Sequence, residues 1–270
     1  SYISESISGI TPNPCIECNR DIKWGVLSEC LNQRGYDYLA TGHYAKLLNH
    51  GDATGLYRAR DLNKDQSYML SVVPKHQLER TILPLGDLLK TDVRSIAQQA
   101  GIRAVERRES QELCFMDGMS NEEFISNVPE VNQPGDIVDM NGNFVGKHKG
   151  FAFYTIGQRK GLGKATGYPQ YVLSKDVVNN RIIIGSADHL GRTNFHVNRI
   201  NLLAPVDYLH KKSLVKIRYR ATPVSCTVRE VSSAEYAIEL SEPLRDITPG
   251  QQAVFYLGDR VIMSGRIKAY

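Results

Sequence analysis

The sequence has no long apolar run and few cysteines, and each absence excludes a class of protein. No stretch approaches the ~20 consecutive apolar residues that span a bilayer, and the first ten residues lack the charged start and apolar core of a secretory signal. The cysteines are odd in number, at five, and irregularly spaced, which disfavours a secreted disulfide scaffold. We therefore expect a cytoplasmic protein in a reducing compartment, with no membrane partner.

The charge balance excludes little by itself. A net charge of +4 over 270 residues does not indicate nucleic-acid binding. Basic residues gather, however, in two stretches, over 147–164 and over 211–220. The first stretch is interleaved with glycines, which let a backbone approach a ligand closely. Both stretches could equally be solvated faces.

The most informative segment that is present reads Thr-Pro-Asn-Pro-Cys-Ile-Glu-Cys-Asn, over residues 11–19. Its prolines fix two φ angles and favour extended conformations before them, so Cys15 and Cys18 lie on a stiff loop that leads into a helix. The positive end of a helix lowers the pKa of a nearby thiol. Metal binding, redox or nucleophilic chemistry, and simple packing all stay open for such a pair.

Periodicity predicts an α/β beginning. A helix is expected over 19–34 and a strand over 36–40, which ends at Gly42, where a ligand approaches the backbone in α/β sheets. Another helix is expected over 92–100, with its apolar side chains facing inward: Val93, Ile96 and Ala97. Cys30 and Cys226 are expected to be small buried apolar residues.

The second half predicts short strands. Alternating residues flank Asn141-Gly142 and Asn179-Asn180, which indicates two hairpins. From residue 194 onward, short strands repeat between turn residues, which is typical of a small β-barrel. The expected barrel strands cover residues 214–219, 225–231, 235–240, 252–257 and 260–267.

Five phrases along the chain, in this order, resemble the MnmA family of tRNA-specific 2-thiouridylases. They cover nearly the whole sequence, and together they are far more specific than any one alone. The phrases are residues 11–19, Ala-Thr-Gly-His-Tyr at 40–44, Lys-Asp-Gln-Ser-Tyr at 64–68, Ser-Gln-Glu-Leu-Cys-Phe at 110–115 and Tyr-Thr-Ile-Gly-Gln-Arg at 154–159.

The resemblance implies an α/β plus β fold of three parts. A remnant of a Rossmann-like PP-loop nucleotide domain would cover 1–61 and 87–120. A small central tRNA-binding domain would cover 62–86 and 121–193, and a C-terminal β-barrel would cover 194–270. The family's phosphate-binding PP-loop motif does not occur in this sequence. We therefore expect an N-terminal portion to be missing, and this chain alone to be inactive.

The resemblance also implies a reaction and its partners. ATP, with Mg²⁺, adenylates the carbonyl oxygen of the wobble uridine in tRNA, and a cysteine persulfide then delivers sulfur to the same carbon. Cys114 matches the persulfide carrier and Cys18 the nucleophile, whose Cα atoms would have to approach within ~7 Å for a disulfide. The sulfur would come from a donor protein, either a cysteine desulfurase or a relay protein.

One position departs from the family pattern, because many members have aspartate where this chain has Cys15. Cys15, Cys18 and Cys114 could therefore hold a 4Fe-4S cluster, for which thiolates are the usual ligands. A zinc ion would need a fourth ligand, for which His43 is the nearest candidate. The persulfide route, the cluster and a structural metal all stay open.

The remaining site residues are matched to the family by motif. Gly42 would contact ATP through its backbone. Two alternatives to the enzyme stay open: a non-catalytic tRNA-binding module with a structural metal or iron–sulfur site, and a tRNA methyltransferase, for whose methyl donor the chain lacks a glycine-rich motif. The residues expected to contact tRNA are Asn13, Pro14 and Cys15 at the target base, then His43, Lys64, Asp65 and Gln66, and in the barrel Arg218, Tyr219 and Gln251.

Overall fold

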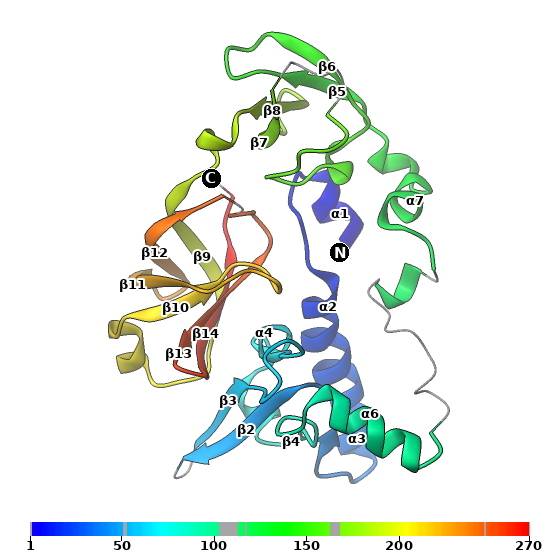
Figure 1. Cartoon of the computed structure of the whole chain (residues 1–270), viewed down its shortest axis with the longest axis vertical. Helices are drawn as coiled ribbons and strands as arrows, with labels where there is room; N and C mark the ends of the chain where they lie inside the picture. Colours follow the sequence, from blue (N-terminus) through cyan, green and yellow to red (C-terminus); the bar gives the residue numbers. More distant parts are fainter. Residues whose placement is uncertain are drawn as a thin grey trace.

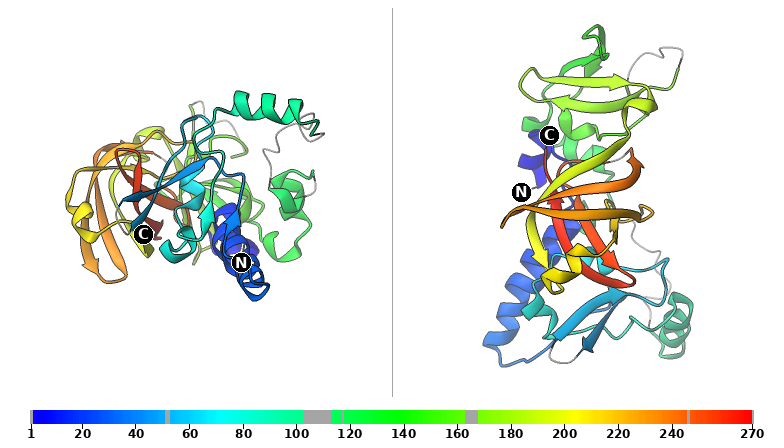
Figure 2. Two further views of the ribbon diagram at one scale, coloured as in Figure 1. Left: turned by 90° about the horizontal axis from the view of Figure 1, so that it is seen from below. Right: turned by 90° about the vertical axis from the view of Figure 1, so that its left-hand side faces the viewer.

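The computed structural model describes residues 2–50, 53–102, 113–116, 118–162, 168–245 and 247–269. Its parts follow one another along the long axis of the molecule (Figure 1). A β-barrel lies beside a column of N-terminal helices, with a small four-stranded sheet at one end and a short α/β region at the other. The right-hand view in Figure 2 shows the barrel between these two ends.

The helical column begins at the cysteine loop. α1 covers Tyr2–Ile7, α2 covers Pro14–Glu17, a π-helix η1 covers Cys18–Leu27 and α3 covers Ser28–Gln33. The helix expected over 19–34 is confirmed, but its first ten residues form i→i+5 hydrogen bonds, a rare pattern that is frequent at functional sites. Gly35, at φ +81°, follows the last helix, as a residue without a Cβ readily does.

A minimal parallel sheet lies beside this column. β1 (Leu39–Ala40) pairs with β4 (Thr81–Ile82), and the crossover between them contains α4 (Ser67–Leu70) and α5 (Lys75–Leu78). α6 (Lys90–Gln99) follows, and none of its residues is buried. The expectation that its apolar side chains face inward is therefore wrong: Ile96, for example, is 55% exposed.

The small sheet at the other end has the strand order β6-β5-β8-β7. Both predicted hairpins are confirmed, with Gly142 and Asn180 in the left-handed region that such turns require. α7 (Asn121–Ser126) precedes the sheet and begins with a capping box formed by Ser120 and Glu123. The strands are β5 (Gly135–Val138), β6 (Phe144–His148), β7 (Tyr171–Asp176) and β8 (Arg181–Gly185).

The predicted C-terminal barrel is confirmed. Six strands in the order β13-β10-β11-β12-β9-β14 close on themselves, because β13 also pairs with β14. β2 (Ala45–His50) and β3 (Ala53–Arg58) extend this sheet from β14. The strands are β9 (Arg192–Leu202), β10 (Ser213–Lys216), β11 (Val224–Ser232), β12 (Glu235–Leu244), β13 (Gln252–Leu257) and β14 (Arg260–Ile267).

Short 3₁₀ helices connect the longer elements. They are η3 (Cys114–Met116), η4 (Pro129–Val131), η5 (Phe151–Phe153), η6 (Ala187–His189) and η7 (Val206–His210).

One apolar core joins the cysteine loop to the barrel. Ile16 of α2 and Trp24 of η1 are almost fully buried in the same cluster as Tyr68 of α4 and Tyr256 of the barrel. Our sequence-based division assigns 62–86 to the central domain, whereas α4 packs in this shared core and β4 pairs with β1. Because burial of each large side chain contributes roughly 1.5–3 kcal/mol, this core fixes the helix that carries the thiols.

Among the described residues, no helix has both the length and the apolar character needed to cross a membrane.

Candidate functional site

The cysteine loop is fixed at its helix start. Asn13 caps α2, and its side-chain Oδ1 accepts a hydrogen bond from the Ile16 amide at 3.4 Å. Pro14 occupies the first turn, where its missing N–H costs nothing. Because Ile16 is buried, Cys15 and Cys18 lie on the other side of the turn, the first exposed and the second half-buried. The loop therefore presents thiols next to a helix start, as the sequence predicts.

A turn of the barrel forms hydrogen bonds with the segment that leads into the cysteine loop. The Thr11 amide donates to the Pro249 carbonyl at 3.1 Å, and the Gln251 side-chain amide donates to the Thr11 carbonyl at 2.8 Å. Gln251, which we expect to contact tRNA, thus uses its side-chain amide within the protein. Its position still links the barrel directly to the cysteine loop.

The third thiol lies within electrostatic reach of Cys15. Cys114, on η3, is exposed. The pKa of Cys15 is raised, first by desolvation of its thiol and then by the neighbouring Cys114 and Cys18. A raised pKa keeps Cys15 protonated, which makes it a weaker nucleophile than a free thiol. Folding therefore brings Cys114 near a loop that is remote from it in sequence.

The described part of the chain contains no group of three His, Cys, Asp or Glu side chains arranged to hold a metal ion. The five cysteines are free thiols. The arrangement of Cys15, Cys18 and Cys114 therefore does not fit a preformed cluster site. Cys226 is buried as expected, which raises its pKa to about 11, whereas Cys30 is exposed and the expectation of burial is wrong.

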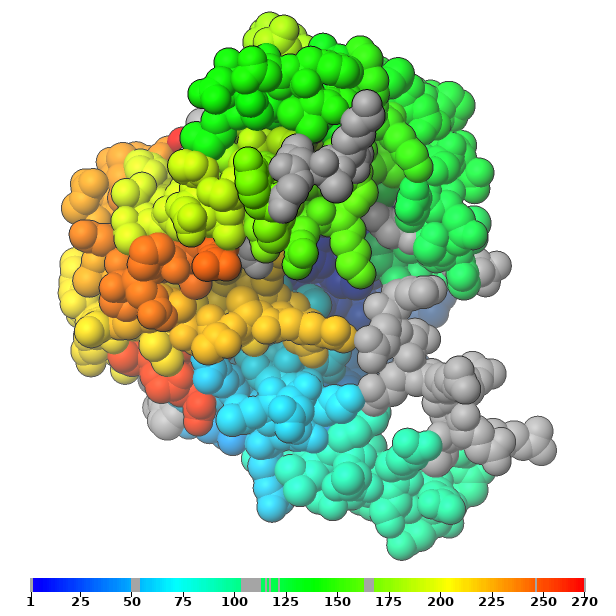
Figure 3. All heavy atoms as spheres, turned by 45° about the horizontal axis from the view of Figure 1, so that its top comes forward, coloured from blue at the N-terminus to red at the C-terminus, as the bar shows by residue number. Residues whose placement is uncertain are grey.

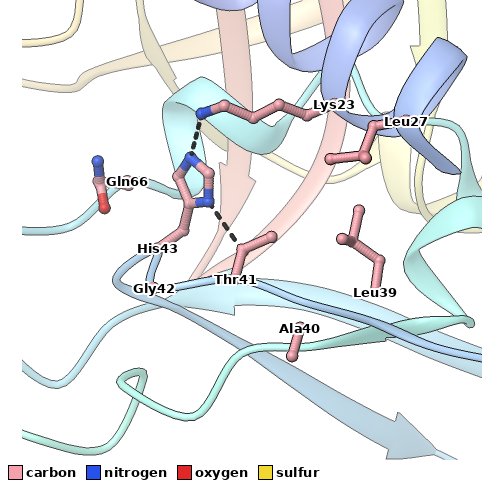
Figure 4. Close-up of a pocket in the computed structure, with 8 residues that line it drawn as sticks. All are labelled: Lys23, Leu27, Leu39, Ala40, Thr41, Gly42, His43 and Gln66. Carbon is pink, nitrogen blue, oxygen red and sulfur yellow. Dashed lines mark hydrogen bonds between the residues drawn. The ribbon is translucent and has the colours of Figure 1, made fainter. Parts of the chain in front are cut away.

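A pocket of about 330 Å³ opens at the carboxyl end of β1. Figure 4 shows its apolar wall, with Leu27 and Leu39, opposite a polar end, with Lys23 and His43. The size is at the lower end of small-ligand sites. Gly42 lines it, in agreement with the general rule that ligands bind at the carboxyl ends of parallel strands.

His43 is held between two partners at this polar end. Its Nδ1 lies 2.9 Å from the Thr41 hydroxyl, and its Nε2 lies 3.5 Å from the Lys23 ammonium (Figure 4). An ammonium group can only donate, so Nε2 accepts and Nδ1 carries the ring proton. Burial, and then the charge of Lys23, lower the pKa of His43 to about 4. His43 is therefore neutral at physiological pH.

The segment 64–66 follows β3 and turns back onto the chain after His43. Gln66 binds Tyr44 twice: its backbone amide donates to the Tyr44 carbonyl at 2.7 Å, and its side chain accepts from the Tyr44 amide at 2.9 Å. Lys64 is half-buried beside it. Gln66 also lines the pocket of Gly42, so this segment borders the site even where its side chains are used internally.

Asp65, expected to contact tRNA, is only 6% exposed and satisfies the backbone around it. Its carboxylate accepts from the Ala59 amide at 3.0 Å, the Ser67 amide at 3.1 Å and the Ser67 hydroxyl at 2.9 Å. Asp65→Ala leaves two buried amides unpaired, and we expect it to lower the free energy of unfolding by about 3 kcal/mol, measured by urea denaturation. Asp65→Asn keeps an acceptor and should lose less. Full stability with weakened tRNA binding would instead make Asp65 an RNA contact.

Arg218 and Tyr219 lie in the turn after β10 rather than on an exposed strand, so the expected strand over 214–219 is too long. Arg218 Nη2 donates to the Ile156 carbonyl at 3.2 Å and to the Thr248 hydroxyl at 2.5 Å. The Tyr219 ring lies 6.1 Å from the Tyr68 ring. The turn therefore joins the barrel to the middle part of the chain and to α4.

Two cations of this region were not predicted as site residues, although one of them, Lys216, belongs to the basic stretch over 211–220. Lys216 lies over the rings of Tyr68 and Tyr219, at 5.9 and 5.8 Å from their centroids. Lys23 reaches the pocket from η1. No sequence signal identified Lys23, because the i→i+5 hydrogen bonding between Cys18 and Leu27 is seen only in the folded helix.

Figure 3 shows how these pieces meet. The N-terminal helices, in dark blue, lie at the floor of a hollow. Barrel strands in yellow and orange border it on one side, the middle part in green on another, and the region of β2 and β3 in cyan on a third. The surface above the N-terminal helices is thus concave in this view and bordered by the barrel, by the middle part and by the region of β2 and β3.

Three family models match consecutive parts of the chain. The family model described as "tRNA methyl transferase HUP domain" matches residues 1–118. The one described as "tRNA methyl transferase PRC-barrel domain" matches residues 122–186. The one described as "Aminomethyltransferase beta-barrel domain" matches residues 192–267.

Curated relatives match over almost the whole chain. A protein named tRNA-specific 2-thiouridylase MnmA from Natranaerobius thermophilus is 42% identical over 99% of this chain and 74% of its own length. Proteins of the same name from Clostridium beijerinckii and Moorella thermoacetica are 40% and 41% identical, over 75% and 76% of their lengths. With the cysteine loop, the strand-end pocket and the closed barrel, this similarity shows that the chain belongs to the tRNA-specific 2-thiouridylase family.

Proposed function

We propose that this protein forms 2-thiouridine at the wobble position of tRNA. Membership of the 2-thiouridylase family supports the reaction class, and the match of residues 1–118 to a HUP domain supports the use of ATP. ATP transfers adenylate to the uracil carbonyl oxygen, which converts that oxygen into a leaving group. Gly42 would contact the nucleotide through its backbone, and Mg²⁺ would bind with the ATP phosphates.

Two thiols complete the reaction. Cys114 receives sulfur from a donor protein as a persulfide, and the terminal sulfur attacks the activated carbon with release of AMP. Cys18 then attacks Cys114 Sγ, which forms a disulfide and leaves the second sulfur on the uracil. A reductant restores both thiols. The observation that supports this proposal is that folding brings Cys114 close enough to Cys15 to raise its pKa, and that Cys18 lies at the end of the same loop.

The hollow suits a strand of RNA with one base turned inward. In this proposal Asn13, Pro14 and Cys15 of the cysteine loop contact the target base on its floor, and Arg218 and Tyr219 contact the RNA at its border. Single-stranded RNA is recognised by stacking of splayed bases and by contacts to phosphate. Among the border residues, Tyr219 and the half-buried Lys216 supply an aromatic ring and a cation of this kind.

The test is direct thiolation. The full-length protein is mixed with an unmodified tRNA transcript, ATP and a persulfide-loaded desulfurase, and the wobble nucleoside is measured by mass spectrometry. We expect 2-thiouridine that depends on both ATP and the sulfur donor. Tight tRNA binding with no thiolation would favour the non-catalytic binding module, and methylation of the same nucleoside would favour a methyltransferase.

The barrel border gives a separate prediction. Arg218→Ala and Tyr219→Ala should each weaken tRNA binding about tenfold, because each removes a contact of roughly 1–3 kcal/mol. Arg218→Ala should also flatten the salt dependence, by roughly 0.7 in slope for a lost phosphate contact. Binding is measured by filter retention at several salt concentrations.

Arg229→Ala, on the exposed part of β11, is the matched control and should leave affinity unchanged. Because Arg218 also bonds within the protein, its variant is compared at a temperature where both proteins remain folded. Wild-type affinity in both border variants would remove this turn from the RNA-binding surface.

A further inference from the structure

Lys23 places a positive charge at the pocket, and no carboxylate among the described residues forms an ion pair with it. Its ammonium contacts His43 Nε2 at 3.5 Å, and it makes no ion pair within the described part of the chain. The two nearby acidic residues of the same helical segment, Glu17 and Asp21, already form ion pairs with another residue. Arg20 binds both Glu17 and Asp21, the latter at 2.7 Å, and this pairing lowers the pKa of Asp21.

His43 cannot neutralise that charge, but it can orient it. Its ring is neutral, and the Lys23 ammonium, which can only donate, sets the tautomer: the Nε2 lone pair faces the ammonium, and the Nδ1 N–H faces the Thr41 hydroxyl (Figure 4). Trp24 lies behind the ring, with 5.5 Å between centroids, and its indole N–H is bound to Thr81 at 2.7 Å. The ring therefore sits on a packed support, and Lys23 is held at the polar end of the pocket.

The rest of the pocket leaves room for a ligand with an apolar surface and a negative charge. Leu27, Leu39 and Ala40 form one wall, and none of the described lining residues is acidic. An ammonium beside an apolar protein surface interacts more strongly with an anion than it would in bulk water. Backbone at the end of a parallel strand, at Gly42, lies beside it.

One helix also connects this charge to the reacting thiol. Cys18 opens η1 and Lys23 follows five residues later, one i→i+5 turn along the same helix. A phosphate bound at Lys23 would therefore lie next to the thiol's own helix, so that binding and chemistry share one rigid element.

We propose that Lys23 binds a phosphate oxyanion in the pocket of Leu39–His43, with His43 as the neutral residue that positions its ammonium. This proposal rests on the function proposed above. It adds Lys23 to the site residues that were matched by the family motifs. The oxyanion belongs either to ATP or to the RNA backbone beside the target uridine. These two sources share the same chemistry and are separated by the experiment.

The experiment measures equilibrium binding of ATP by calorimetry and of an anticodon stem-loop RNA by filter retention, on the full-length protein. Lys23→Met keeps the length of the side chain and removes its charge. We expect it to weaken one of the two ligands on the order of tenfold, the loss of a charge-assisted hydrogen bond, and the ligand affected identifies the source of the phosphate. Lys23→Arg should restore most of the affinity.

Lys75→Met is the matched control, since Lys75 is exposed and its ion pair among the residues that the structure describes is with Glu79, at 3.9 Å. It should bind both ligands as the wild type does. An NMR titration adds a readout specific to the contact: removing the charge of Lys23 should raise the lowered pKa of His43. Because Lys23 is half-buried and not in the core, Lys23→Met should fold, and melting temperature checks this.

The proposal fails if Lys23→Met binds both ATP and RNA within twofold of the wild type, or if Lys75→Met weakens binding equally. It also fails if Lys23→Arg is as weak as Lys23→Met while both are folded, because a charge-binding role would then be excluded. Thiolation by the wild-type protein is scored separately. Its absence would overturn the proposed function and leave the binding comparison valid.

Discussion

Thiolation should fall to the level of a reaction without enzyme when either Cys114 or Cys18 is replaced by serine. Serine keeps the shape of cysteine but holds no persulfide and forms no disulfide. The two losses should differ in kind. Cys114→Ser should accept no sulfur from the donor, whereas Cys18→Ser should accept it and stall. Radiolabelled sulfur retained on the protein after gel filtration distinguishes these outcomes, and full activity of Cys114→Ser would overturn the two-thiol route.

Cys15→Ser separates this route from a cluster. In the two-thiol route Cys15 only shapes the loop, so part of the activity should survive. In a cluster route it is a ligand, so activity and bound iron should disappear together. The protein is purified with and without oxygen, and iron is measured in both preparations. Cys30→Ser is the control, because Cys30 is an exposed thiol on α3, and it should be as active as the wild type.

Gly250→Ala, in the turn before the barrel strand β13, should displace the segment that leads into the cysteine loop and so reduce activity. Gly250 has φ +92°, and a Cβ there would lie 2.1 Å from the side chain of Ile10 and 3.1 Å from the Thr11 carbonyl. The left-handed conformation and the clash together should lower the free energy of unfolding by roughly 2–5 kcal/mol. To relieve the clash, the segment of Ile10 and Thr11, which precedes the cysteine loop, must move away from the barrel. We expect thiolation to fall at least tenfold, with a lower melting temperature.

Gly258→Ala is the matched control for this substitution. Gly258 also has a positive φ, at +58°, but nothing lies within 4 Å of the added Cβ. It should cost only about 1–2 kcal/mol of backbone strain and leave the rate per folded molecule unchanged. Equal loss of activity in both variants would mean that strain in the barrel, and not the contact with Ile10, is responsible.

The sequence was sufficient where structure is decided locally. Asn141-Gly142 and Asn179-Asn180 specify their hairpins because the left-handed turn needs those residue types, and the regular strands after residue 194 specify a barrel. β9 was missed, although it is the longest strand of the barrel. Its exposed start, over 192–194, carries polar side chains that resemble a loop, and only its pairing with β12 and β14 makes it a strand.

The sequence indicated which residues belong to the candidate site, but it did not show which groups their side chains contact. The cysteine loop and Gly42 could be found because prolines and glycine act on their own backbone. Asp65 and Gln251 were read as surface residues, whereas both bind backbone groups within the protein. Gln251 and its partner Thr11 are 240 residues apart, and no pattern within a short window contains such a pair. Lys23 was not predicted because its charge is available to a ligand only if Arg20 forms the ion pairs with Glu17 and Asp21, which the sequence does not show.

The ion pair between Glu5 and Arg266 has a consequence for the order of folding during synthesis. Arg266 of β14 holds the carboxylate of α1 through two hydrogen bonds, at 2.8 and 2.5 Å, between residues 261 positions apart. At ~5–20 residues per second, a ribosome needs roughly 15–50 s to make the intervening chain. α1 therefore leaves the ribosome long before its partner exists. The cysteine loop acquires its final support only when the last strand has emerged, so a stalled or truncated chain carries exposed thiols without the barrel that positions them.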